Sequence, residues 1–161
     1  MSFLIVGEDN VIEAVVDALV GDHDLVRVVT QDAARAARLK DRGAFVAVGD
    51  PADPDLVQRA GQGARTAVLF DDTSITADLI DALSAARISR IVYAGRDADT
   101  VELVSHSGLE FVILRRRRRL FGKRDGEMLV AAIVAADDLA GAPRLTIDLS
   151  DDAALGELIQ D

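Results

Sequence analysis

Short apolar runs alternate with helical patterns along most of this chain, and this alternation restricts its possible folds more than any other feature. The six runs are Phe3–Val6, Leu25–Val29, Ala44–Val48, Thr66–Phe70, Ser89–Ala94 and Leu109–Leu114. They are rich in Val and Ile, as buried strands are, and the connections carry apolar residues at helical spacing. Helical crossovers join parallel strands and cover both faces of the sheet. The sequence therefore predicts an α/β fold: a doubly wound, parallel six-stranded sheet with helices on both faces.

Capping signals separate the expected helices from the strands. The first helix carries Val11, Val15 and Leu19 on one face and ends at Gly21. The later helices are expected over Asp32–Arg42, Asp53–Gln62, Ile75–Ala86 and Asp97–His106. Several of them start at an aspartate, a preferred N-cap, and Pro54 stands at an early helical position, where its missing N–H does no harm.

Two segments follow the six-strand unit. A helix is expected over Gly122–Leu139, and the Gly141-Ala142-Pro143 break then precedes a candidate strand, Arg144–Leu149. Ser150 and Asp151 are expected to cap a last short helix that holds Leu155, Leu158 and Ile159. We therefore expect a main domain over residues 1–140 and a strand–helix extension over residues 141–161.

The opening stretch, SFLIVGEDNVIEAVVDAL, has the form of the first unit of a Rossmann-like dinucleotide-binding domain. A buried strand leads into Gly7, and an amphipathic helix follows whose N-terminus suits a phosphate. Only the first of the three expected glycines is present, because Asp9 and Ile12 stand at the second and third positions. The phosphate loop is therefore altered.

Charge and composition exclude several classes of function. The formal net charge is −10, which disfavours general binding to nucleic acid. The chain has no cysteine and therefore no disulfide or thiolate site, and no apolar run is long enough for a membrane helix. No signal peptide is evident, so we expect a cytoplasmic protein without membrane insertion. The acid-rich, lysine-poor composition fits either a high-salt environment or a GC-rich genome.

The order of motifs resembles the TrkA-N domain, also called the RCK N-terminal domain, which regulates potassium channels and transporters. The matching pieces are FLIVG, LVRVVTQD, DRGAFVAVGDPADPDLVQRAG, TAVLFDDTSITADLIDALSAARISRIVYAGRD and HSGLEFVIL, within residues 2–140. The most specific of these is the Gly49-Asp50 step before an Asp-Pro helix start. A weaker resemblance, through an RG-x-x-V-x-x-GD rhythm, links the chain to NmrA-like short-chain proteins.

The resemblance implies a regulatory, ligand-sensing domain that binds NAD(H) or an adenine nucleotide. It places cofactor contacts at Gly7, Asp9, Asn10, Val11, Thr30, Gln31, Gly49, Asp50, Asp71 and Asp72. Two of these positions depart from the family pattern. Asp9 sets a carboxylate where a pyrophosphate approaches the backbone, and Thr30 replaces the usual acid for the ribose hydroxyls. We therefore expect weakened or altered nucleotide binding.

Acidic residues follow several of the expected strands. Glu8, Asp9, Asp50, Asp71 and Asp72 would meet at the carboxyl edge of the sheet, where a divalent cation is one possible ligand. Capping of helix N-termini explains the same residues without a ligand, and we favour that interpretation and predict no metal site.

The arginine run Arg115–Arg119 is the strongest local charge anomaly. It suits a phosphorylated ligand, an anionic membrane surface, an acidic partner or solvated pairing with the chain's own acids. Neither His23 nor His106 has a neighbour that suggests a nucleophile–base pair, so we expect no enzyme activity.

The family resemblance also implies partners. The helix over Gly122–Leu139 stands where the family has its dimer-forming crossover helix, and its alanine-rich stripe predicts a homodimer. A membrane transporter or another protein is a further expected partner. The alternatives that stay open are an NAD(P)-binding oxidoreductase-like domain of NmrA type, the N-terminal domain of a phosphoesterase, and a protein-interaction module without a small ligand.

Overall fold

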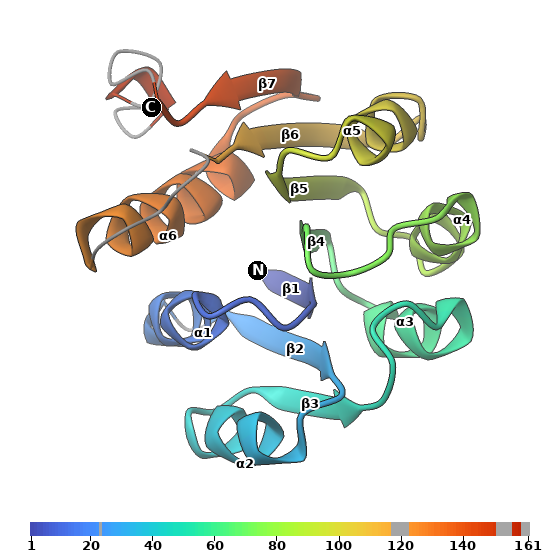
Figure 1. The fold of residues 1–161 in the computed structure, drawn as a ribbon, viewed down its shortest axis with the longest axis vertical. Helices are drawn as coiled ribbons and strands as arrows, with labels where there is room; N and C mark the ends of the chain where they lie inside the picture. Colours follow the sequence, from blue (N-terminus) through green and yellow to red (C-terminus); the bar gives the residue numbers. More distant parts are fainter. Residues whose placement is uncertain (23, 117–122, 151–155, 159–161) are drawn as a thin grey trace.

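Seven parallel strands form one sheet at the centre of the molecule. The computed structural model describes residues 1–22, 24–116, 123–150 and 156–158. The strands are β1 (Ser2–Val6), β2 (Leu25–Thr30), β3 (Phe45–Val48), β4 (Thr66–Phe70), β5 (Arg90–Gly95), β6 (Glu110–Arg115) and β7 (Arg144–Asp148). Their order is β3-β2-β1-β4-β5-β6-β7 (Figure 1). The order reverses between β1 and β4, so the chain is doubly wound and a crevice is expected outside the carboxyl ends of these strands.

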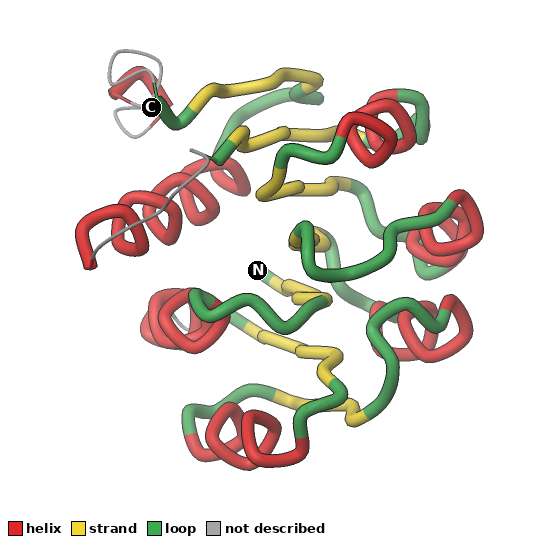
Figure 2. Tube along the Cα trace, in the orientation of Figure 1, coloured by secondary structure: helices red, strands yellow, loops and turns green. Residues whose placement is uncertain are grey.

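Helices cover both faces of the sheet (Figure 2). One face carries α1 (Ile12–Gly21), α2 (Ala33–Asp41) and α6 (Lys123–Asp138), and the other carries α3 (Pro54–Gly61), α4 (Ala77–Ala85) and α5 (Ala98–Ser105). Strand β1 is buried on both sides because its side chains alternate between the two cores. Phe3 and Ile5 belong to the core under α1 and α6, whereas Leu4 and Val6 belong to the core under α3 and α4.

The predicted ends of the helices and strands lie within two residues of the observed ends at nearly every position. The prediction of a six-stranded sheet was wrong. Strand β7 joins the same sheet and runs parallel to β6, with Leu145 beside Val112. Helix α6 is the crossover between these strands, as in the earlier units. The Gly141-Ala142-Pro143 break is the loop that ends the crossover, and the Pro143 carbonyl accepts the Phe111 N–H at 2.8 Å.

Helix α6 is tied to the sheet by its apolar face and by its C-terminus. Leu129, Ala132, Ile133 and Ala136, the stripe expected to form a dimer, are fully buried within the chain. The predicted starting residue of this helix, Gly122, lies outside the described residues. The same holds for Asp151–Leu155 and Ile159 of the expected last helix. Leu158 of that helix is buried in the core under α6. In the part of the chain that the structure describes, no helix is long and apolar enough to cross a membrane.

Candidate functional site

The candidate site lies at the turn between β1 and α1, beside the order reversal of the sheet. Gly7 opens this turn with a φ of 142°, a conformation that favours glycine. A Cβ at Gly7 would lie 2.7 Å from Oδ1 of Asp72 and 3.2 Å from Oγ1 of Thr73. Glycine is therefore needed here because the turn after β4 packs directly against it.

The Asp9 carboxylate lies at the start of α1, the end of a helix that suits an anion. Its Oδ1 accepts the backbone N–H of Val11 at 3.0 Å, at the start of α1, and its Oδ2 accepts from Nη1 of Arg116. Helix N-termini and arginines are the groups that bind phosphate in such loops. The chain thus supplies its own anion to this end of α1.

The Glu8 carboxylate fills the neighbouring position at the end of β2. Oε2 accepts the Thr30 hydroxyl at 2.5 Å, and Oε1 accepts the backbone N–H of Gln31 at 2.6 Å. The backbone N–H of Glu8 donates to Asp72 Oδ2 at 2.8 Å. Thr30 is the position predicted to face the ribose of a nucleotide, and its hydroxyl is bonded to Glu8 instead; Gln31, another predicted cofactor contact, bonds to Glu8 through its backbone.

Arg35, in the first turn of α2, holds this arrangement together and was not among the residues predicted from the sequence. It is 8% exposed, and its guanidinium donates to the Glu8 carbonyl and to Glu13 Oε1, the latter at 3.3 Å. Nη2 also lies 3.5 Å from Asn10 Oδ1. The one signal for it in the sequence is its position three residues after the Asp32 cap, which starts α2 directly beyond β2.

A polar cavity of about 400 Å³ lies at the phosphate loop. Its lining comprises Glu8, Asp9, Asn10, Val11, Asp72, Arg116 and Gly126. Burial raises the pKa of the Asp72 carboxyl above its ordinary value; the Glu8 N–H bond partly offsets this, and the Asp9 carboxylate adds to it. The cavity is thus dominated by acid groups, with Arg116 as its cation.

The remaining predicted residues lie apart from this cavity. The Asp71 carboxylate accepts the Tyr93 hydroxyl and the backbone N–H of Arg96, the latter at 2.9 Å, and so fixes the turn after β5. Asp50 accepts the Ala52 N–H at 2.9 Å in a local turn, and the Gly49 N–H donates to the Thr30 carbonyl at 2.9 Å. Among the described residues, no group of three or more His, Asp or Glu side chains is placed to hold a metal ion.

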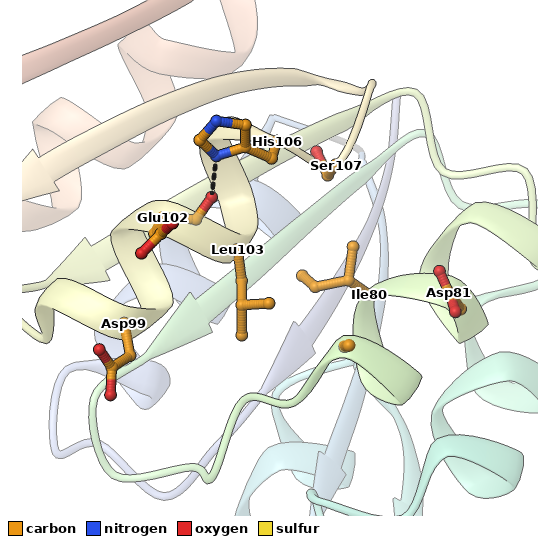
Figure 3. A pocket seen from close by; sticks show the side chains of 8 residues that line it. Ile80, Asp81, Asp99, Glu102, Leu103, His106 and Ser107 are labelled. Atoms are coloured by element: carbon orange, nitrogen blue, oxygen red, sulfur yellow. Dashed lines mark hydrogen bonds between the residues drawn. The ribbon is translucent and has the colours of Figure 1, made fainter.

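A second hollow, of about 510 Å³, separates α4 from α5 (Figure 3). Ile80 and Leu103 form its apolar floor. Nδ1 of His106 lies 2.9 Å from the Glu102 carbonyl, and the Ser107 hydroxyl donates to the Val104 carbonyl at 2.7 Å. His106 and Ser107 are thus bonded to backbone groups and not to each other, so these two side chains form no nucleophile–base pair.

The sequence matches the model of a known domain family. The model of the TrkA-N domain matches residues 3–115, more than half of the chain, and this range contains every residue predicted to contact a cofactor. The chain belongs to the TrkA-N domain family. The TrkA-N match ends at the last residue of β6, so α6 and β7 lie beyond it. No curated protein sequence matches the chain significantly.

Solved structures with the same fold include several nicotinamide-dependent proteins. The Citrobacter sp. triphenylmethane reductase complexed with NADP(H) has a TM-score of 0.73 and 15% identity, covering 92% of this chain and 70% of that one. ChuY, an anaerobilin reductase from Escherichia coli O157:H7, has a TM-score of 0.72 and 16% identity over 92% and 96%. A putative NAD-dependent epimerase/dehydratase from Bacillus halodurans has a TM-score of 0.72 and 13% identity over 99% of each chain. At these identities the similarity establishes the Rossmann-like fold alone.

Proposed function

We propose that this TrkA-N domain is a regulatory, ligand-sensing module with altered nucleotide binding, associated with potassium transport and without catalytic activity of its own. The observation that carries the proposal is the position of two acid side chains. The Asp9 carboxylate is bonded to the start of α1, and the Glu8 carboxylate is bonded to Thr30 and Gln31. We infer that these carboxylates lie where the phosphate and the ribose of a nucleotide would bind. Family membership supports the regulatory role.

A nucleotide that enters this site has to displace Asp9. Its phosphate would then accept from the Val11 N–H and from Arg116, which are the groups that Asp9 now uses. An unmoved carboxylate a few Å from a phosphate in a partly dry cavity is strongly repulsive. NAD(H) or an adenine nucleotide is therefore expected to bind weakly. A rise in its concentration would increase the fraction of molecules in which Asp9 is displaced and the loop has changed its conformation.

The test is thermal unfolding of the wild type and of Asp9→Gly with NAD, NADH, NADP, ATP, ADP and AMP. A ligand bound by the native state alone raises the apparent stability. We expect little or no shift for the wild type and a clear rise for Asp9→Gly with at least one nucleotide. Asp53→Gly is the matched control, because Asp53 forms a similar turn at the start of α3 away from the cavity. If Asp9→Gly responds no more than Asp53→Gly, the proposed role of Asp9 is wrong.

A second candidate is an NADP(H)-binding, oxidoreductase-like domain of NmrA type. A solved structure with the same fold supports it, because the Citrobacter sp. triphenylmethane reductase is complexed with NADP(H). Oxidation of NADPH by the purified protein with a carbonyl substrate, followed by nicotinamide absorbance, distinguishes this candidate from the regulatory module. A protein that binds no nucleotide, in the wild type or in Asp9→Gly, would instead be an interaction module without a small ligand.

We also propose that the module is a homodimer. The stripe of α6 predicted for this contact is covered by the sheet, but the opposite side of α6 forms a hollow of about 700 Å³ with α1. Val130, Ala131, Val134 and Ala135 of α6 and Ala14 of α1 line it, and these small apolar residues suit close helix packing. Light scattering at moderate salt tests the proposal: only monomer across micromolar concentrations would contradict it.

A further inference from the structure

Arg27, within β2, is a partly buried cation without a counter-charge. Its Nη1 is buried and has no hydrogen-bond partner, and it is the single buried side-chain nitrogen or oxygen in that state in the described part of the chain. An unpaired charged donor away from water costs free energy. Among the described residues, Arg27 forms no ion pair with an acid side chain, although the protein has a net charge of −10. The guanidinium nitrogens of Arg27 other than the buried Nη1 therefore suit an acceptor from another molecule.

An exposed aromatic side chain lies directly beside Arg27. Phe45 of β3 is its register partner, and because paired residues of neighbouring strands point to the same face, both lie on the face that carries α3. Phe45 is 63% exposed and Val48, at the other end of β3, is 53% exposed. Arg27, Phe45, Ala47 and Ala60 line a hollow of about 390 Å³. A cation, an exposed aromatic ring and small apolar residues thus meet at one place.

Strand β3 also has a free edge. It is the last strand on its side of the sheet. The Gly49 N–H donates to the Thr30 carbonyl of β2. Because the backbone groups of successive residues point to opposite sides of a strand, the N–H and C=O of Val46 and Val48 point away from β2. The opposite edge strand, β7, carries charged Arg144 and Asp148, which discourage strand pairing, whereas β3 (FVAV) carries no charge.

The position of α2 determines what fits at this edge. Helix α2 packs mainly against β3 rather than β2 and lies at the outer side of the sheet (Figure 1). If a second copy paired its β3 with this β3, the two α2 helices would lie on the same face about one strand spacing, or about 5 Å, apart. Packed helices need about 8–10 Å between their axes. An extended segment without a helix of its own meets no such obstacle.

We propose that the β3 edge binds an extended acidic segment of a partner protein by strand addition. Its backbone pairs with Val46 and Val48, an apolar side chain covers Phe45 and Ala47, and an Asp or Glu side chain accepts from the Arg27 guanidinium. Backbone bonds supply affinity in this mode of recognition, and side chains in alternate pockets supply specificity. The proposal is independent of nucleotide binding, because the β3 edge and the phosphate-loop cavity share no lining residue.

A library of random heptapeptides displayed on phage and selected on the wild-type protein tests this proposal. We expect enrichment of peptides with β-branched residues on both sides of one acid residue. Binding of a synthetic selected peptide is then measured by fluorescence polarisation, together with its Glu→Gln or Asp→Asn counterpart. Val48→Pro removes one outward N–H and leaves the β2 ladder intact, so we expect affinity to fall roughly ten-fold. Val48→Ala, which keeps the N–H, is the matched control and should bind within about two-fold.

Arg27→Met tests the charge. It should bind the acidic peptide and its amide counterpart equally, whereas the wild type should prefer the acidic peptide by roughly ten-fold. Circular dichroism of each variant verifies folding. The proposal is overturned if no peptide is enriched, if Val48→Pro binds as well as Val48→Ala, or if these variants change only self-association. Octanoate binding that is lost in Arg27→Met but unchanged in Val48→Pro would also overturn it, because it would mark a small-molecule site.

Discussion

At the scale of single residues, two acids and two arginines account for the closed phosphate loop. Glu8 and Asp9 accept from the backbone N–H groups of Gln31 and Val11, and each carboxylate pairs with an arginine, Arg35 and Arg116 respectively. The repulsion expected from an acid-rich loop is thereby reduced within the chain itself. Under the proposed function, a nucleotide would therefore compete with these intramolecular bonds as well as with water.

Arg35→Ala should destabilise the protein by about 2 kcal/mol, because it leaves Glu8 and Glu13 without a cation in a partly buried setting. Arg38→Ala is the matched control: Arg38 also pairs with Glu13, but its side chain is 54% exposed, so less than about 1 kcal/mol is expected. Urea unfolding measures both free energies. Equal effects of the two substitutions would contradict the central role of Arg35.

Asp72 makes stability depend on pH. Its pKa is raised in the folded protein, chiefly by burial, so the folded state binds a proton more readily than the unfolded state. The carboxyl therefore favours folding at low pH, and this contribution is lost as the pH rises through the raised pKa. Asp72→Asn should have a higher unfolding midpoint than the wild type at pH 7, with the difference shrinking as the pH falls toward 4. A constant difference between these pH values, measured by thermal melts, would contradict the assignment.

At the scale of elements, α6 depends on one buried arginine. Arg90 of β5 is fully buried and donates to the carbonyls of Ala136 and Leu139, both at 2.9 Å, and to that of Asp137. It also pairs with Glu110 at 2.9 Å. The last carbonyls of a helix have no partner within the helix, so a buried arginine beneath them caps the C-terminus and fixes α6 to the sheet.

Arg90→Met should therefore cost about 3 kcal/mol, since it leaves several buried carbonyls without donors. Arg144→Met removes an arginine that makes one exposed bond, to the Gly108 carbonyl at 3.0 Å, and should cost less than about 1 kcal/mol. Chemical unfolding compares the two, and hydrogen exchange of the α6 amides locates the effect. An Arg90 variant that unfolds like the Arg144 variant would show that α6 is held by its apolar face alone.

The sequence was sufficient for local features and insufficient for contacts between distant segments. Strand and helix ends follow from periodicity and caps such as Asp32 and Asp97, which act within three residues. The roles of Arg35 and Arg90 depend on groups 27 and 46 positions away, and no local pattern reports such pairs. The sequence predicted the turn between β1 and α1 because Gly7 and Asp9 lie close together in the chain, but it gave no indication that Glu8 bonds to Thr30.

At the scale of the whole molecule, the net negative charge affects the stability of the fold. Cores on both faces bury the strands, and acid groups line the phosphate-loop cavity. A net charge of −10 on a chain of 161 residues produces a repulsion that opposes the compact state. Salt concentration should therefore act on the stability of the whole fold rather than on one contact.

We expect the unfolding midpoint at pH 7 to rise as sodium chloride increases from low concentration to about 1 M, where charges are screened beyond about 3 Å. The rise reflects weaker repulsion among the excess acids, and it should outweigh the loss of exposed ion pairs, each worth less than about 1 kcal/mol. Melting curves near pH 4.6, the isoelectric point, are the control, since the net charge there is close to zero and the salt effect should nearly vanish. A midpoint that falls with salt at pH 7 would mean that the ion pairs, and not the net charge, dominate the electrostatic contribution to stability.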